Sequence, residues 1–127
     1  MRKCPVFICY RQVDGTKIAQ WLFKNLHGKC LSDRGEVDTA EEVSSLDVYF
    51  DQTAPAVGDW KAIHQPRLHT SQAMIIVCTP GSFQRLEKND WVHREIEWWL
   101  KNRKVAPILI DATGEGERWV PKVIKDR

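Results

Sequence analysis

The stretch AMIIVC at residues 73–78 decides the fold, because it is short, continuously apolar and ended by the turn residues Thr79-Pro80-Gly81-Ser82. Such a run is typical of a strand buried on both faces of a parallel sheet. PVFICY at residues 5–10 and LDVYF at residues 46–50 predict two earlier strands. VAPILI at residues 105–110 predicts a fourth, and its internal proline favours a place near the sheet edge or the strand start.

Helical patterns separate these strands. Apolar residues at every fourth position predict a helix that Asp14-Gly15-Thr16 opens and His27-Gly28 ends. A second helix is expected over residues 59–69, bent or shortened by Pro66, and a third over residues 91–102. Strands that alternate with helices predict an α/β fold: a flavodoxin-like open parallel sheet with helices on both faces.

The remaining segments bound the domain. Residues 29–45 are polar and acidic, which predicts a mobile connection. Residues 111–127 are too few for another strand and helix, so we expect a trimmed C-terminal element. A chain of 127 residues makes one domain, with a core over about residues 5–111, and we expect it to be part of a larger protein.

Composition excludes several classes of function. A 43% hydrophobic content excludes a disordered tail, and 19 basic against 17 acidic residues leave no electrostatic footprint for nucleic acid. No apolar stretch is long enough to span a membrane, and the N-terminal one is too short for a secretory signal. The four cysteines form no CxxC pair, which predicts reduced, buried thiols in a cytoplasmic protein and no zinc site.

A ligand site is expected where the strands end. In open parallel sheets, ligands bind at the carboxyl ends of the strands, near the point where the strand order reverses. We therefore predict that seven residues converge there: Tyr10, Arg11, Asp51, Gly81, Ser82, Trp91 and Glu95.

The helix of residues 91–102 carries the most informative side chains. Asp90 is positioned to cap it, and Trp91 and Glu95 lie one turn apart on the same face. Glu95 falls at the border of the apolar stripe, where partial desolvation primes a carboxylate for function. An acid beside an indole suits a cationic, ring-shaped substrate group.

Three segments give the chain a resemblance to the TIR (Toll/interleukin-1 receptor) domain family. VFICYR at residues 6–11 is similar to the first box of the family, with Cys9 where serine is usual. VYFD at residues 48–51, followed by Gly58, is similar to the second strand and its loop. DWVHREI at residues 90–96 resembles the corresponding segment of NAD-hydrolysing members.

The resemblance implies an NAD+ glycohydrolase or cyclase with Glu95 as the catalytic residue. Phe7, Tyr10, Arg11, Trp91 and His93 match positions that line or support the nucleotide pocket. NAD+ would be the substrate, with no cofactor. The implied role is the effector of a bacterial anti-phage immune protein. Its partners would be other TIR domains and a sensor domain or partner protein.

Each residue also has a simpler interpretation. Arg11 pairs with Asp51 or another acid as readily as it binds phosphate, and Phe7 fits a core position better than a ligand contact. Gly81-Ser82 fits plain turn chemistry as well as a phosphate site, and His93 fits a helix cap or a solvent-facing position.

Two other functions stay open at this point. The loop at residues 52–58 and the tryptophans suit a TIR–TIR interaction module without turnover. A phosphorelay receiver is less favoured, because it requires an acidic cluster after the first strand, where Tyr10-Arg11-Gln12 stands.

Overall fold

A five-stranded sheet forms the centre of the protein. The computed structural model describes residues 2–32, 43–50, 65–84 and 90–126, and its strands follow the order β2-β3-β1-β4-β5. Four strands run parallel, while the short β2 pairs with β3 in the antiparallel direction. The parallel strands have the flavodoxin-like order, with β1 between β3 and β4, so the predicted fold class is confirmed. The strands are β1 (Arg2–Cys9), β2 (Cys30–Ser32), β3 (Val43–Tyr49), β4 (Ala73–Cys78) and β5 (Ile108–Asp111).

Two strands are longer than the sequence predicts, and β2 was not predicted. β1 begins at Arg2 because its first three residues pair with Ser44, Ser45 and Leu46 of β3. β3 extends back to Val43, where β2 pairs along its outer edge. The prediction of a mobile connection over residues 29–45 is therefore wrong at both ends, and residues 33–42 lie outside the described part of the chain.

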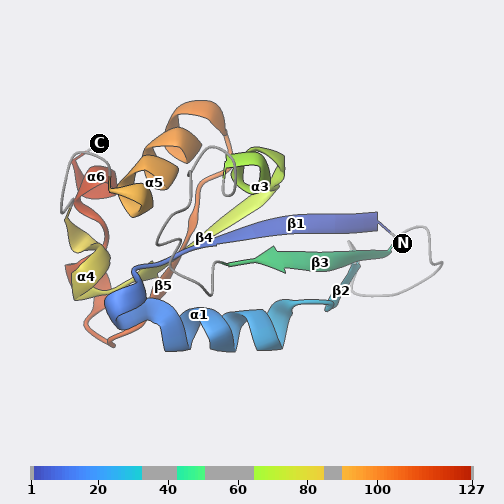
Figure 1. Ribbon diagram of the computed structural model, residues 1–127, viewed down its shortest axis with the longest axis horizontal. Helices are drawn as coiled ribbons and strands as arrows, with labels where there is room; N and C mark the ends of the chain where they lie inside the picture. The colour runs from blue at the N-terminus through green and yellow to red at the C-terminus, as the bar shows by residue number, and fades with distance from the viewer. Residues whose placement is uncertain (1, 33–42, 51–64, 85–89, 127) are drawn as a thin grey trace.

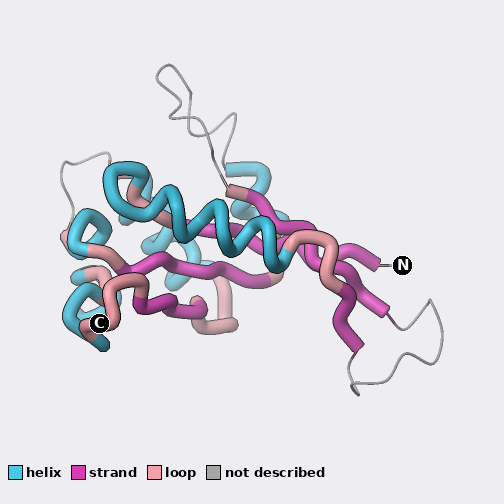
Figure 2. Tube along the Cα trace, turned by 90° about the horizontal axis from the view of Figure 1, so that it is seen from below, coloured by secondary structure: helices cyan, strands magenta, loops and turns pink. Residues whose placement is uncertain are grey.

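Helices cover both faces of the sheet, as predicted (Figure 1). α1 packs on one face, which Figure 2 shows from the side of that helix. α3, α5 and α6 pack on the opposite face. The helices are α1 (Gln12–Leu26), α3 (Gln65–Thr70), α4 (Pro80–Phe83), α5 (Trp91–Asn102), the 3-10 helix η2 (Gly116–Trp119) and α6 (Lys122–Lys125).

The first helices differ slightly from their predicted bounds. α1 begins at Gln12, two residues before Asp14, and ends at Leu26 as predicted. Gly28 follows with a φ of 81°, a conformation that glycine adopts without strain. Of the helix predicted over residues 59–69, residues 59–64 lie outside the described residues. The described part, α3, carries Pro66 in its first turn, where a missing N–H is tolerated.

The core is divided by the sheet, and β1 contributes to both halves. Phe7 and Cys9 belong to the cluster beneath α5, whereas Val6, Ile8 and Tyr10 belong to the cluster against α1. Successive side chains of a strand point to opposite faces, which explains this division. The face that a β1 residue occupies therefore follows from its position in the strand.

The C-terminal part completes the α5 side. The indole Nε1 of Trp99 donates a 2.7 Å hydrogen bond to the carbonyl of Val105, which joins the end of α5 to the segment before β5. β5 starts at Ile108 rather than Val105, directly after Pro107, which has no N–H to donate to the ladder. The Trp119 ring then meets the Phe83 ring edge-on at 5.7 Å, so the tail packs back onto α4.

The structure also bears on the chemistry expected of the cysteines. All four are free, and Cys9 and Cys78 are buried as predicted. Cys30 is exposed and Cys4 only half-buried, so the prediction of buried thiols is wrong for these two. No helix among the described residues combines the length and apolar character needed to cross a membrane.

Candidate functional site

Asp90 fixes the start of α5. Its Oδ1 accepts hydrogen bonds from the backbone N–H groups of Val92 (3.1 Å) and His93 (3.5 Å), as the predicted N-cap should. The helix then buries Val92, His93, Glu95, Ile96 and Trp99. The predicted apolar stripe is confirmed, and it carries the Glu95 carboxylate with it toward β1.

Arg11 ties this helix to the sheet edge. Its Nη2 donates to Oδ2 of Asp90 at 2.5 Å, and its Nε donates to the carbonyl of Gly81 at 2.8 Å. The Asp90 side chain is 0% exposed and the Arg11 side chain 16% exposed, so the ion pair is largely removed from water. We call Arg11, Gly81 and Asp90 the clasp. Of the two interpretations of Arg11, the structure therefore shows the one in which it pairs with an acid.

The N–H groups of Gly81 and Ser82, which a phosphate would need, are engaged by Asp14 and Thr79. The Asp14 carboxylate accepts from Thr79 Oγ1 and from the N–H of Gly81, both at 2.7 Å. A Cβ at Gly81 would lie 2.6 Å from Asp14 Oδ1, so only glycine fits this approach. The N–H of Ser82 donates to Thr79 Oγ1 at 3.3 Å. The turn-chemistry interpretation of Gly81-Ser82 therefore matches the structure, whereas the phosphate interpretation finds both N–H groups engaged.

His93 and Ser82 link α5 to α4. The His93 ring is buried, and its Nε2 lies 3.1 Å from the carbonyl oxygen of Ser82. A carbonyl only accepts, so Nε2 carries the proton in this contact. The Ser82 hydroxyl is buried and accepts from the N–H of Thr79. Both residues hold the two helices together, and His93 does not face solvent.

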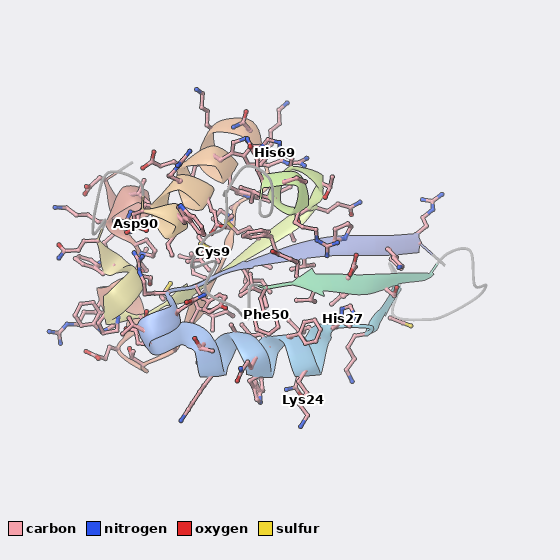
Figure 3. All side chains as sticks on the ribbon, viewed as in Figure 1. Cys9, Lys24, His27, Phe50, His69 and Asp90 are labelled. Atoms are coloured by element: carbon pink, nitrogen blue, oxygen red, sulfur yellow. The ribbon has the colours of Figure 1, made fainter. Side chains whose placement is uncertain are left out.

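Glu95 is a buried acid and not a surface one. Glu95 is 8% exposed, and its Oε1 lies 3.4 Å from the Sγ of Cys9. The same sulfur lies 3.5 Å from the carbonyl oxygen of Val92. Burial, followed by the charge of Glu95, raises the pKa of the Cys9 thiol well above its ordinary value. Cys9 is therefore a neutral thiol at neutral pH. Figure 3 shows Cys9 near the end of β1, with Asp90 at the start of α5.

The structure brings together part of the predicted set. Arg11, Gly81 and Ser82 lie at the carboxyl edge beside the first turns of α5, which carry Trp91, His93 and Glu95. Trp91 is half-buried against the core cluster beneath α5. These six residues therefore occupy one region of the fold. The strand ends predicted this for all of them except His93, which only the family resemblance had indicated.

Two predicted residues, Phe7 and Tyr10, do not join them, and the position of a third is not described. Phe7 is a core residue, buried beneath α5 and packed on the Tyr49 ring at 5.5 Å. Tyr10 lies on the α1 side, with its ring 6.1 Å from that of Phe50. The expected convergence of Tyr10 with Glu95 is therefore wrong, because the sheet lies between their faces. Asp51 lies outside the described residues.

Sequence reasoning missed Cys9, Asp14 and Thr79 as members of this region. Strand alternation held the signal for Cys9, because it shares a face with Phe7 and not with Tyr10. Asp14 was interpreted only as a helix opener, and nothing local indicates that its carboxylate bonds to residues 65 and 67 positions away.

Fold and site together define an α/β domain with a buried carboxylate and a charged clasp at the carboxyl edge of its sheet. Among the residues that the structure describes, no group of three His, Cys, Asp or Glu side chains is arranged to hold a metal ion. A scan of the sequence against protein-family models finds no match, and searches of curated proteins and of solved structures find none either.

Proposed function

We propose that this domain cleaves the bond between nicotinamide and ribose in NAD+, with Glu95 as the catalytic residue. One observation carries the proposal: the Glu95 carboxylate is 8% exposed, in the second turn of a helix that starts at the carboxyl edge of a parallel sheet. Ligands of such sheets bind at that edge. A surface acid without a role would be far more exposed.

The chemistry requires only one carboxylate. Nicotinamide leaves as a neutral ring and takes the electron pair of the glycosidic bond, so no acid has to protonate it. Positive charge then develops on the ribose, and a fixed carboxylate stabilises it. Water attack gives ADP-ribose after loss of a proton, whereas attack by the adenine gives a cyclic product. Both outcomes share the step assigned to Glu95.

Neighbouring residues have supporting roles in this proposal. Trp91, half-buried one turn before Glu95, offers a ring to the nicotinamide. Arg11 holds the start of α5 through Asp90 and thereby positions Glu95. The remaining exposed part of its guanidinium is a candidate for phosphate contact. The resemblance to TIR enzymes adds the biological setting, a cytoplasmic effector of bacterial anti-phage immunity that acts on assembly with a sensor.

Product analysis tests the proposal. The full chain is incubated with NAD+, with and without a crowding agent, and nicotinamide, ADP-ribose and cyclic products are separated by chromatography. We expect Glu95→Gln to lower nicotinamide release by about 100-fold or more, because one preorganised electrostatic group is lost. Glu97→Gln is the matched control, since Glu97 lies on the exposed side of the same helix. NAD+ left intact by the wild type in both conditions, or turnover unaffected by Glu95→Gln, would refute the proposal.

A second candidate function is an interaction module that assembles without turnover. Its support is the edge strand β5, where Ile108 is 51% and Leu109 41% exposed, next to an exposed Val105. Apolar side chains on an edge strand favour pairing with another chain. If Glu95→Gln retains host protection while Ile108→Lys abolishes both protection and self-association in sedimentation, the module is the better description.

A further inference from the structure

The Cys9 thiol is aimed at the candidate catalytic carboxylate. Its Sγ lies 3.4 Å from Oε1 of Glu95 and 3.5 Å from the carbonyl of Val92, one α5 turn earlier. Cys9 is fully buried. Its position in β1, two residues after Phe7, directs it to the α5 face of the sheet. The contact therefore follows from the strand register and the docking of α5.

The thiol is the donor in this contact. An ionised carboxylate only accepts hydrogen bonds, as does a backbone carbonyl. Burial and the nearby Glu95 charge keep the pKa of the Cys9 thiol well above its ordinary value, so its proton is present at neutral pH. Of the two acceptors, the charged one makes the stronger hydrogen bond. The S–H group is thus a fixed donor next to Glu95.

We propose that Cys9 is a positioning residue that holds the Glu95 carboxylate in its catalytic orientation. The inference rests on the proposed role of Glu95 in NAD+ cleavage. A glutamate side chain has several rotatable bonds, and rates fall by about 100-fold when a reacting group is misplaced by about 1 Å. Cys9 does not touch the substrate; it acts by restricting where Oε1 lies.

Three variants of the full chain separate a donor from mere core volume. Cys9→Ala removes the donor, while Cys9→Ser keeps one of similar reach. Cys78→Ala is the matched control, because Cys78 is buried in the same core cluster and its Sγ points to the carbonyl of Ile76 at 3.8 Å. Thermal unfolding of each variant shows that it is folded before its kinetics are measured.

The expected pattern is a selective loss of turnover. For NAD+ cleavage, kcat should fall by about 10- to 100-fold in Cys9→Ala with KM within about twofold, because orientation and not binding is lost. Cys9→Ser should recover most of kcat, and Cys78→Ala should resemble the wild type. Equal kcat in Cys9→Ala and Cys78→Ala, or equal losses in Cys9→Ala and Cys9→Ser, overturns the proposal.

An activity-independent readout distinguishes this failure from failure of the proposed function. The infrared S–H stretch of Cys9, assigned by its absence in Cys9→Ser, should shift in Glu95→Gln because the charged acceptor is replaced. An unshifted band overturns the inferred contact whatever the activity. If the band shifts but the wild type leaves NAD+ intact, the contact stands, the proposed function has failed and catalytic positioning is refuted with it.

Discussion

Replacing Asp90 by alanine should destabilise the domain strongly, because this carboxylate serves two purposes. Its Oδ1 caps α5 at the N–H groups of Val92 and His93. Its Oδ2 pairs with Arg11 at 2.5 Å. Removing it leaves uncapped N–H groups at the helix start and a guanidinium without its acid in a site largely shielded from water.

The burial of the Arg11–Asp90 ion pair determines how much Asp90→Ala lowers the free energy of unfolding. Loss of an N-cap costs about 1 kcal/mol, and breaking one partner of a buried ion pair costs about 3–5 kcal/mol. The Arg11 side chain retains 16% exposure, which places the pair's contribution toward the lower end. We expect Asp90→Ala to lower the free energy of unfolding by about 4 kcal/mol. Asp90→Asn should cost about 1 kcal/mol less, because asparagine is an equally good cap.

Urea unfolding followed by tryptophan fluorescence measures these differences. Asp47→Ala is the matched control, because Asp47 pairs with Arg67 at 3.6 Å with both side chains partly exposed. Exposed pairs of this kind contribute about 0–1 kcal/mol. If Asp90→Ala costs no more than Asp47→Ala, the clasp does not hold the helix and the argument from its burial is incorrect.

Two further predictions concern the same edge of the sheet. Gly81→Ala should cost about 1–3 kcal/mol, because the new Cβ would lie 2.6 Å from Asp14 Oδ1; in an Asp14→Ala background the cost should fall, and an unchanged cost in a double-mutant cycle would contradict the steric cause. Alkaline pH should also weaken the fold. Burial raises the pKa of Cys78 from 9.0 to about 11 and that of Cys9 well above 9.0, so above pH 9 the unfolded chain loses thiol protons that the native state retains. The stability present below pH 9 should then decrease by about 1.4 kcal/mol per pH unit for each such thiol. Urea titrations from pH 8 to 10 should show that the free energy of unfolding decreases less in Cys78→Ser than in the wild type. Equal decreases in the two proteins would contradict the role of the Cys78 thiol.

The sequence predicted the elements whose signals are local. β4 matches its apolar run from Ala73 to Cys78, and α5 matches its pattern from Trp91 to Asn102, with Asp90 as the cap. Strand ends and helix caps depend on residues only a few positions apart. β2 and the start of β3 were missed because polar residues such as Ser44 and Ser45 form strand there only through pairing with β1 and β2.

The sequence predicted the region where these residues lie, but not which side chains bond to each other. The rule that parallel strands end at one edge brought Arg11, Gly81 and Glu95 into one region. It could not choose Asp90 as the partner of Arg11, since that choice depends on how α5 docks. The misassigned face of Tyr10 was avoidable, because the sequence predicted Tyr10 in the same strand as Cys9, and neighbouring strand residues point to opposite sides. Tyr10 directly follows β1 and packs on the α1 side, whereas Cys9 faces α5.

The clasp affects the order in which the domain folds during synthesis. Arg11 meets residues 70 and 79 positions further along the chain, so its contacts require most of the domain to have been synthesised. Domains fold during translation in N-to-C order, and contacts of long span form late. A nascent chain on the ribosome therefore carries β1 and α1 well before it carries an anchored Glu95. Under the proposed function, a nascent chain therefore gains NAD+ cleavage only after α5 has been synthesised and has docked on the sheet edge.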